Sequence, residues 1–305
     1  MTASNVCAIV VTHQPDISVL TDVLNGLARQ VAAVVVVDND SEEKTLRLIS
    51  TCAEERGLHL LALKDNLGLG AAHNRGIDYA RGQGSQYVLI LDQDSVPCAG
   101  MVARLVQASE TLRASGHRIA AVGPRYVDPT TRQSSFFVRF GCLEFRRVWC
   151  DETSAQTHEA DFLISSGSLI SISAIDEIGG MDEAFFIDHV DTEWFLRARA
   201  KGFKSFGVCD AIMTHKLGSE TLNVWVGRWR TMPLHSPLRH YYTVRNSILL
   251  YRRQYSPRKW IVNDVLRLLK VFCFFVLFAA PRLQHAGMMV RGAWHGLRGR
   301  AGRYK

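Results

Sequence analysis

The sequence predicts an α/β fold in which a mostly parallel central sheet is flanked by helices. In the first half of the chain, short runs rich in Val, Ile and Leu alternate with longer segments of helical spacing, which is typical of strand–helix–strand units. The 305 residues are 47% hydrophobic and include only 8 prolines and 23 glycines. This composition suits one large globular domain or two modest ones, and it excludes a disordered, collagen-like or coiled-coil chain.

Five strands and four helices are expected in the first half. The expected strands are continuous apolar runs, typical of strands buried on both faces, at 6–12, 34–38, 58–63, 87–92 and 119–123. The expected helices have helical length and spacing and lie at 17–29, 42–56, 70–81 and 101–115. Ser41 is the expected N-cap of the second helix, because Glu42 and Glu43 suit a first helical turn. Repetition of such units gives parallel strands joined by right-handed crossovers.

The regular alternation stops after residue 124. An antiparallel excursion is expected at 134–140 with 143–149, and a strand-like segment at 161–172. Two short helices are expected at 174–179 and 189–201, and two long helices at 239–253 and 259–280. Residues 221–238 contain two prolines and are expected to be irregular. We therefore expect a globular domain over 1–225, divided near residue 124, and a helical region over 226–305.

Charge is divided unevenly along the chain. Residues 1–220 carry 20 Lys and Arg against 28 Asp and Glu, whereas residues 221–305 carry 16 against Asp264 alone. The net charge of +7 is therefore the sum over an acidic body and a basic tail, and the acidic body argues against a nucleic-acid partner.

The expected helix at 259–280 is apolar and aromatic with basic residues beside it, which is typical of a helix lying on an anionic membrane surface. The alternative is docking on the body or on a partner subunit.

Neither the N-terminal segment nor the cysteines suggest export. The N-terminus lacks a basic segment followed by an apolar stretch of secretory length, so no signal peptide is expected. The longest uncharged apolar run, 271–280, is too short to cross a membrane. Seven cysteines without a C-x-x-C pair argue against a disulfide framework and a zinc ribbon, and they favour a reducing compartment.

Polar side chains follow three of the expected strands where each strand ends. They are Thr12-His13, Asp38-Asn39-Asp40 and Asp92-Gln93-Asp94. In an open parallel sheet, ligands bind beyond these carboxyl ends, and clustered carboxylates repel one another unless a cation or hydroxyl groups join them. A divalent cation and a ribose would supply both. The alternative, that such residues only form turns and cap helices, is strongest for Asp40.

The Asp92-Gln93-Asp94 segment suggests a metal site. Two carboxylates one residue apart suit Mg²⁺ or Mn²⁺ that keeps open positions for diphosphate oxygens. His215 is the best candidate for a further ligand, although a single histidine is more often structural or solvated.

The segment 185–199 (FFIDHVDTEWFLRAR) suggests a general base. On a helix that starts near His189, Asp191 falls in the first turn and is open to a ligand, where it could take a proton from a hydroxyl group. Glu193 and Arg197 are four residues apart and are expected to pair. The alternative is an amphipathic helix whose charges are merely solvated.

Gly68-x-Gly70-x-x-His73 approaches the dinucleotide-binding fingerprint and raises a rival hypothesis, an NAD-dependent oxidoreductase. Two features argue against it. His73 stands in place of the third small residue, and the motif lies in the third strand–helix unit although that fold places it in the first.

Together these motifs resemble the family 2 glycosyltransferases with the GT-A fold, and more narrowly the bacterial rhamnosyltransferases of lipopolysaccharide and polysaccharide assembly. The resemblance covers about residues 6–300. It is carried by VVVVDND, NLGLGAAHNRGI, LILDQDS, ISSGSLIS, GGMDEAFFIDHVDTEWFLRARAKGF, and His215 with Gly218-Ser219. RHYYTVRNSILLYRR and GLRGRAGR are similar to the C-terminal pattern of the narrower group.

The resemblance implies an inverting, metal-dependent glycosyltransferase. Its donor would be a nucleotide sugar, dTDP-L-rhamnose, and its acceptor a saccharide or lipid-linked saccharide. Residues 1–225 would form the GT-A catalytic domain, with a nucleotide-sugar half at about 1–124 and an acceptor half at about 125–225. The basic region 226–305 would hold the enzyme on the inner face of the bacterial cytoplasmic membrane. A non-catalytic scaffold of the same fold is a further alternative, and no oligomeric state is predicted.

The resemblance also implies roles for individual residues. Thr12, Asp38 and Asp40 would contact the nucleoside, Asn66 and His73 would lie near the nucleotide, and Asp92, Gln93 and Asp94 would complete the nucleotide-sugar site. Asp94 and His215 would hold Mg²⁺ or Mn²⁺, with Asp92 helping. Asp191 would be the general base. Many relatives have Glu where this chain has Val190, which leaves Asp188 as a substitute base.

Overall fold

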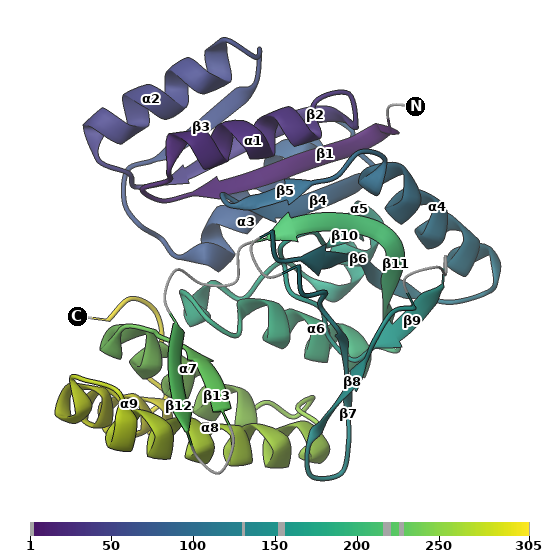
Figure 1. The fold of residues 1–305 in the computed structure, drawn as a ribbon. Helices are drawn as coiled ribbons and strands as arrows, with labels where there is room; N and C mark the ends of the chain where they lie inside the picture. Colours follow the sequence, from purple (N-terminus) through teal and green to yellow (C-terminus); the bar gives the residue numbers. More distant parts are fainter. Residues whose placement is uncertain (1–2, 130–131, 152–155, 216–220, 226–228, 305) are drawn as a thin grey trace.

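The chain is built around a mixed nine-stranded sheet. The structure, a computed structural model, describes residues 3–129, 132–151, 156–215, 221–225 and 229–304 (Figure 1). The strand order is β3-β2-β1-β4-β10-β6-β11-β5, and β9 pairs with β11 beside this path. The expected mixed α/β fold with helices on both sides of the sheet is confirmed.

The parallel part of the sheet comes from the first half of the chain. β1 (Ala3–Thr12), β2 (Val31–Asn39), β3 (His59–Leu63) and β4 (Tyr87–Asp92) are parallel to one another. In β1, Cys7, Ile9 and Val11 face one core cluster, and the alternate residues Val6, Ala8 and Val10 face the other. Burial on both faces explains why these strands are continuous apolar runs.

The helices of the first half connect these strands and cover both faces of the sheet. They are α1 (Ile17–Leu27), α2 (Glu43–Glu54), α3 (Leu69–Gly82) and α4 (Met101–Ala114). The N-cap prediction for α2 was wrong. The helix begins at Glu43 with Glu42 at the N-cap, because the Ser41 hydroxyl donates instead to Asp38.

The second half completes the sheet in mixed directions. β6 (Ile119–Val127) is parallel to β11 (Lys204–His215), whereas β5 (Ser95–Pro97), β9 (Thr157–Ala160) and β10 (Leu169–Ser171) are antiparallel to their neighbours. The antiparallel excursion is confirmed as the hairpin of β7 (Phe137–Phe140) and β8 (Phe145–Val148). The strand-like segment at 161–172 is reduced to β10.

Three short helices follow β10 along the chain. They are α5 (Ile172–Ile178), the short 3₁₀ helix η1 (Glu183–Phe185) and α6 (Val190–Ala200). Of these, α6 lies between the sheet and the C-terminal region (Figure 1). The irregular structure expected over 221–238 was wrong in part, because β12 (Thr221–Trp225) and β13 (Trp229–Pro233) form an antiparallel hairpin there. Gly218-Ser219, which belong to the resemblance, lie outside the described residues.

The C-terminal region consists of α7 (Pro237–Tyr251), α8 (Arg258–Phe278) and α9 (Arg282–Leu297). Leu250 of α7 and Trp260 of α8 are buried in the same core cluster as the sheet, so these helices dock on the body. α9 approaches α7 closely, since a Cβ on Gly292 would lie 2.5 Å from the Tyr241 carbonyl oxygen. Among the described residues, no helix combines the length and apolar character that a membrane span requires.

One disulfide was not expected from the cysteine pattern. Cys150, which follows β8, is bonded to Cys209 of β11. The two cysteines are 59 positions apart, and such a long-range contact leaves no trace in local cysteine spacing.

Candidate active site

The three strand ends that carry polar residues lie side by side. β1 pairs with both β2 and β4, in a register that sets Thr12 opposite Asp38 and Val11 opposite Asp92. The structure therefore brings the expected carboxylates to one edge of the sheet, at the carboxyl ends of its parallel strands. This is the edge where open α/β sheets bind ligands.

Asp38 is fully buried at this edge and is saturated with hydrogen bonds. The Thr12 hydroxyl donates to its Oδ1 at 2.8 Å, and Ser41 donates from its hydroxyl to Oδ1 at 2.6 Å and from its backbone N–H to Oδ2 at 2.9 Å. Thr12 is equally buried. In this structure the two side chains join the end of β1 to the turn after β2, so their contact with a nucleoside stays a prediction.

A second set of hydrogen bonds joins the loops above this edge. Asn39 donates from Nδ2 to Asn66 Oδ1 at 3.1 Å and accepts the Leu67 N–H at 2.9 Å. Gln93 Oε1 accepts the His13 N–H at 2.8 Å. Asn66, Gln93 and the half-buried Asp40, whose φ is +73°, all keep some exposed surface here. These polar groups line an edge that is open to a ligand.

The predicted metal ligands are brought together by the pairing of β5 with β11, which sets His215 opposite Ser95. His215 Nδ1 lies 3.5 Å from Asp94 Oδ1. The Asp94 side chain is 45% exposed and that of His215 is 16% exposed, so the pair faces an open side. These two side chains are 121 positions apart in the sequence. A cation bound by both would connect the loop before β5 to the end of β11.

A chain of hydroxyl groups orients His215. The Asp92 N–H donates to Ser166 Oγ at 2.9 Å, and the Ser166 hydroxyl donates to Ser95 Oγ at 2.7 Å. Ser95 Oγ lies 2.9 Å from His215 Nδ1. Such partners fix the ring orientation and the tautomer of a metal-binding histidine. Sequence reasoning missed Ser95 and Ser166, although both belong to segments that carry the resemblance.

Electrostatics indicate that the carboxylates of this cluster repel one another. Burial and repulsion from Asp94, with a smaller contribution from Asp191, raise the pKa of Asp92 to about 6, although His215 and Arg239 act to lower it. Carboxylates and an imidazole are a donor set that hard divalent cations accept. The residues present therefore fit Mg²⁺ or Mn²⁺, which would relieve the repulsion between the carboxylates.

Asp191 lies in the first turn of α6, close enough to Asp92 to affect its titration. Its Oδ2 accepts the Ser165 N–H at 3.3 Å, and its Oδ1 accepts the Thr192 N–H at 2.6 Å. Burial raises the pKa of Asp191, although the Thr192 hydrogen bond and His189 oppose the shift. A carboxyl group whose pKa is raised is a better proton acceptor. The expected pair of Glu193 and Arg197 is confirmed at 2.8 Å.

The loop that leads into α6 is held by α7. The buried Asn246 amide donates from Nδ2 to the carbonyl oxygens of Phe185, Ile187 and Asp188, at 2.9, 2.7 and 2.8 Å. Arg245 Nη2 donates to the Phe185 carbonyl at 3.0 Å. The roles of Arg245 and Asn246 could not be predicted from the sequence, because side chains that bind a distant backbone follow no local pattern.

Asp188 is already engaged by α7. Its Oδ1 accepts from Arg239 Nε at 3.2 Å, and its Oδ2 accepts the Thr243 hydroxyl at 3.0 Å. A carboxylate that is ion-paired and hydrogen-bonded on both oxygens is a poor substitute for Asp191 as a base. Asp191 remains the stronger candidate.

The Gly68-x-Gly70 turn serves packing in this structure. Gly68 has a φ of +90°, and a Cβ there would lie 2.6 Å from the Phe186 carbonyl oxygen. The same oxygen accepts the Leu69 N–H at 2.6 Å, so it lies at the N-terminus of α3 where a pyrophosphate would bind in a dinucleotide fold. The turn therefore gives no support to the oxidoreductase hypothesis.

His73, on the buried side of α3, is fully buried, and neither ring nitrogen has a hydrogen-bond partner among the described residues. Burial lowers the pKa of His73 to about 4, which keeps the ring neutral. Its predicted place near the nucleotide is not tested by these contacts.

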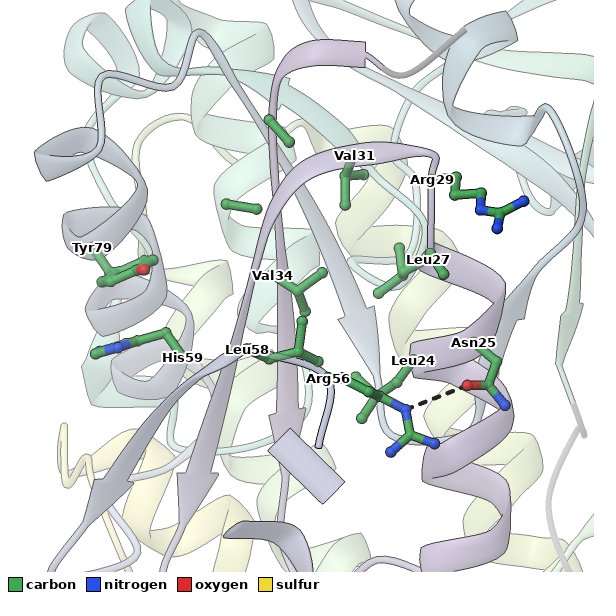
Figure 2. Close-up of a pocket in the computed structure, with 14 residues that line it drawn as sticks. Leu24, Asn25, Leu27, Arg29, Val31, Val34, Arg56, Leu58, His59 and Tyr79 are labelled. Atoms are coloured by element: carbon green, nitrogen blue, oxygen red, sulfur yellow. Dashed lines mark hydrogen bonds between the residues drawn. The ribbon is translucent and has the colours of Figure 1, made fainter. Parts of the chain in front are cut away.

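A cavity of about 660 Å³ lies away from this site (Figure 2). Its lining includes Arg29, Val31, Arg56, His59 and Tyr79, and Arg56 donates to Asn25 there. Val31 and His59 begin β2 and β3, so the cavity is at the amino ends of the parallel strands. It holds none of the predicted site residues.

Two solved structures are similar to this fold. GalNAc-T7 in a structure with UDP, GalNAc and Mn²⁺ matches with a TM-score of 0.59 and 14% identity, over 87% of this chain and 54% of that one. S. aureus TarS, residues 1–349, matches with a TM-score of 0.55 and 15% identity, over 96% of this chain and 81% of that one. At these identities the likeness concerns the fold alone, a mixed α/β fold of the GT-A type.

Sequence comparison identifies the family. The model of glycosyl transferase family 2 matches residues 7–179. The dTDP-rhamnosyl transferase RfbF of Shigella flexneri is 30% identical over 302 residues, which cover 98% of this chain and 97% of RfbF. The chain belongs to glycosyl transferase family 2.

Proposed function

We propose that this glycosyltransferase moves L-rhamnose from dTDP-L-rhamnose to a saccharide acceptor, with inversion at the anomeric carbon. The observation that carries the donor assignment is the similarity to RfbF along nearly the whole of both chains. The proposed site has two halves, a nucleotide-sugar half at about 1–124 and an acceptor half at about 125–225, and Asp191 of the acceptor half is the general base.

In the proposed reaction, the acceptor hydroxyl gives its proton to a carboxylate oxygen of Asp191. The hydroxyl oxygen forms a bond to the anomeric carbon as the bond from that carbon to the diphosphate breaks, and the electron pair leaves with the diphosphate. Asp94 and His215, with Asp92 beside them, would hold Mg²⁺ or Mn²⁺, whose charge would stabilise the departing dTDP. The raised pKa of Asp191 supports its role as the base.

The remaining predicted residues divide by exposure. Asp40, Asn66 and Gln93 keep exposed surface at the edge of the sheet, and we assign them direct contacts with the nucleotide. Thr12, Asp38 and His73 are fully buried, and we assign them to the wall behind the nucleoside. Their substitution should change donor binding through the shape of that wall.

Donor binding and transfer can be measured separately. We expect dTDP-rhamnose with Mg²⁺ to raise the melting temperature more than UDP or GDP sugars do, and Asp191→Asn to keep this shift while losing transfer of rhamnose. Stronger stabilisation by a UDP or GDP sugar would contradict the donor assignment. Quenching of protein fluorescence by NADH would favour the oxidoreductase, and an absence of donor turnover by the folded wild type with every acceptor and metal would favour the scaffold.

We further propose that the C-terminal helices hold the enzyme on an anionic membrane, at the inner face of the bacterial cytoplasmic membrane, where a lipid-linked saccharide of lipopolysaccharide or polysaccharide synthesis would be the acceptor. Val262, Val265, Leu269 and Phe272 are spaced three and four residues apart on α8, and all are exposed. α9 exposes Leu283, Val290, Trp294 and Leu297. Arg258, Lys259, Lys270, Arg282 and Arg291 lie on the same two helices, which supports an anionic surface as the partner.

Sedimentation with lipid vesicles tests this attachment. Leu269→Asp should weaken binding to phosphatidylglycerol vesicles about tenfold or more, because it removes an inserted apolar side chain and adds a like charge. Leu48→Asp is the matched control, since Leu48 of α2 is 46% exposed and Leu269 is 56% exposed. Equal loss in both variants, or equal binding to phosphatidylcholine vesicles, would contradict the proposal.

A further inference from the structure

A cluster of metal-binding side chains lies outside the proposed active site. The sulfur atoms of Cys150 and Cys209 and a ring nitrogen of His158 all lie within 4.8 Å of one another. Cys209 belongs to β11 six residues before His215, which is about 20 Å along an extended strand. The cluster is therefore distinct from the Asp94 and His215 pair.

The backbone holds these three residues together. His158 of β9 pairs with Gly207 of β11, and the Cys209 N–H donates to the Gln156 carbonyl at 3.0 Å. Cys150 reaches the same place from the end of the β7–β8 hairpin, with its Cα 5.5 Å from that of Cys209. Three separate segments thus converge on one point.

The chemistry of the cluster favours a soft divalent cation. His158 Nε2 is buried and has no hydrogen-bond partner among the described residues, so the ring nitrogen aimed into the protein lacks the partner that a buried polar atom needs. Two thiolates and an imidazole are a donor set typical of zinc. Zinc bonds of about 2.0–2.3 Å set tetrahedral ligands about 3.3–3.8 Å apart, so the cluster needs only a small opening to accept the ion.

We propose that the chain, once the disulfide is reduced, binds Zn²⁺ through Cys150, His158 and Cys209. A dithiol reductant supplies two electrons and two protons, which break the sulfur–sulfur bond to give two thiols, and the reductant becomes a disulfide. Zn²⁺ then displaces the two thiol protons and takes the neutral imidazole as its third ligand. Water fills the fourth position, because Cys150 and His158 are only partly buried.

The two states of the site exclude each other, since the same sulfur atoms serve the disulfide and the metal. In either state, the end of the β7–β8 hairpin and β9 are fastened to β11. The proposed metal keeps this connection in a reducing environment, where a disulfide does not persist. The two thiolates also balance the charge of the cation.

Cobalt is the probe that distinguishes this site from one made of carboxylates. The full chain is first reduced with a phosphine, which becomes the phosphine oxide by taking an oxygen atom from water while the disulfide takes up two electrons and two protons to give two thiols. The reduced chain is then titrated with Co²⁺. We expect a near-ultraviolet thiolate-to-cobalt charge-transfer band that saturates at one equivalent and disappears when Zn²⁺ is added. Carboxylate and imidazole ligands give no such band, so cobalt bound at Asp94 and His215 does not contribute.

Variants identify the ligands. Cys150→Ser and Cys209→Ser should each abolish the band, and His158→Ala should shift and weaken it. Cys142→Ser, which removes an exposed free cysteine of the same hairpin, should leave it unchanged. Oxidised wild-type protein should show no band, and this control needs no substitution if Cys209→Ser fails to fold. Absence of the band in the reduced wild type, its persistence in Cys150→Ser, or an unchanged spectrum in His158→Ala would overturn the proposal.

Discussion

Asn246→Ala should lower kcat, although Asn246 is buried away from the substrate and acts by positioning the loop that precedes Asp191. Asn246 is fully buried and holds the carbonyl oxygens of Ile187 and Asp188, which precede Asp191 by a few residues. The Phe185 carbonyl keeps Arg245 as a partner, so two carbonyls lose theirs. At about 1–3 kcal/mol for each buried group that loses its hydrogen bond, the loop is destabilised by about 2–6 kcal/mol.

The loop has a reason to move once this support is gone. Phe186, Asp188 and His189 have φ values of +64°, +60° and +62°, which L-residues adopt at a cost of about 1–2 kcal/mol each. Relaxation of these residues would displace the start of α6 and its Asp191. A displacement of about 1 Å costs about 100-fold in rate. We therefore expect kcat to fall about 10- to 100-fold while the KM for the donor changes less than about threefold.

Steady-state kinetics and thermal unfolding, measured on the same preparations, separate positioning from stability. Leu20→Ala is the matched control, because Leu20 of α1 is fully buried on the other face of the sheet. Its loss should cost a comparable 2–5 kcal/mol of unfolding free energy. The Leu20→Ala variant should have a lowered melting temperature. Assayed at temperatures well below it, the variant should keep the wild-type kcat. A wild-type kcat in Asn246→Ala, with only the melting temperature lowered, would refute the reasoning.

Three further predictions follow from the carboxylates and the hydroxyl chain. Activity should fall as the pH decreases through the raised pKa of Asp191, because a protonated carboxyl group accepts no proton; a pH-rate profile flat down to the ordinary range of aspartate would contradict this. Asp92→Asn should stabilise the metal-free protein by about 1–3 kcal/mol at pH 7, because a carboxyl group with a raised folded-state pKa destabilises the fold when ionised, and the gain should vanish below about pH 4. Ser95→Ala should raise the Mg²⁺ or Mn²⁺ concentration needed after EDTA treatment about tenfold, and an unchanged metal requirement would show that Ser95 does not orient His215.

The parallel part of the fold could be predicted because each of its strands and helices has a local pattern of apolar residues that indicates it. β4 has the bounds that its apolar run indicated, and the helices of the first half differ from the expected ranges by only a few residues at their ends. β9 and β11 were missed, because their pairing is decided by contacts between segments far apart in the chain. α9 was missed as a helix, since its regular exposed and buried pattern depends on the α7 surface that it covers.

The candidate site divides in the same way. Asp38, Asp92 and Asp94 could be placed at one edge, because parallel strands end on the same side of a sheet. His215 could be named but not positioned, since its neighbour Ser95 comes from the far edge strand β5. Asn246 could not be found at all, because its partners are backbone carbonyls about 60 residues away, and any sequence has those.

The C-terminal helices connect the proposed membrane surface to the proposed base. Arg245 of α7 donates both to the Phe185 carbonyl and to the Gly302 carbonyl beyond α9, and the Gly302 N–H donates to the Ala184 carbonyl at 2.7 Å. α9 rests on α7 through Gly292 and Gly296, where any side chain would meet the backbone of α7. A displacement of α9 at a lipid surface would therefore be transmitted through direct contacts to the loop that precedes Asp191 in the chain. If this coupling operates, anionic vesicles should raise the kcat of the wild type, and Asn246→Ala should remove that increase while leaving vesicle binding intact.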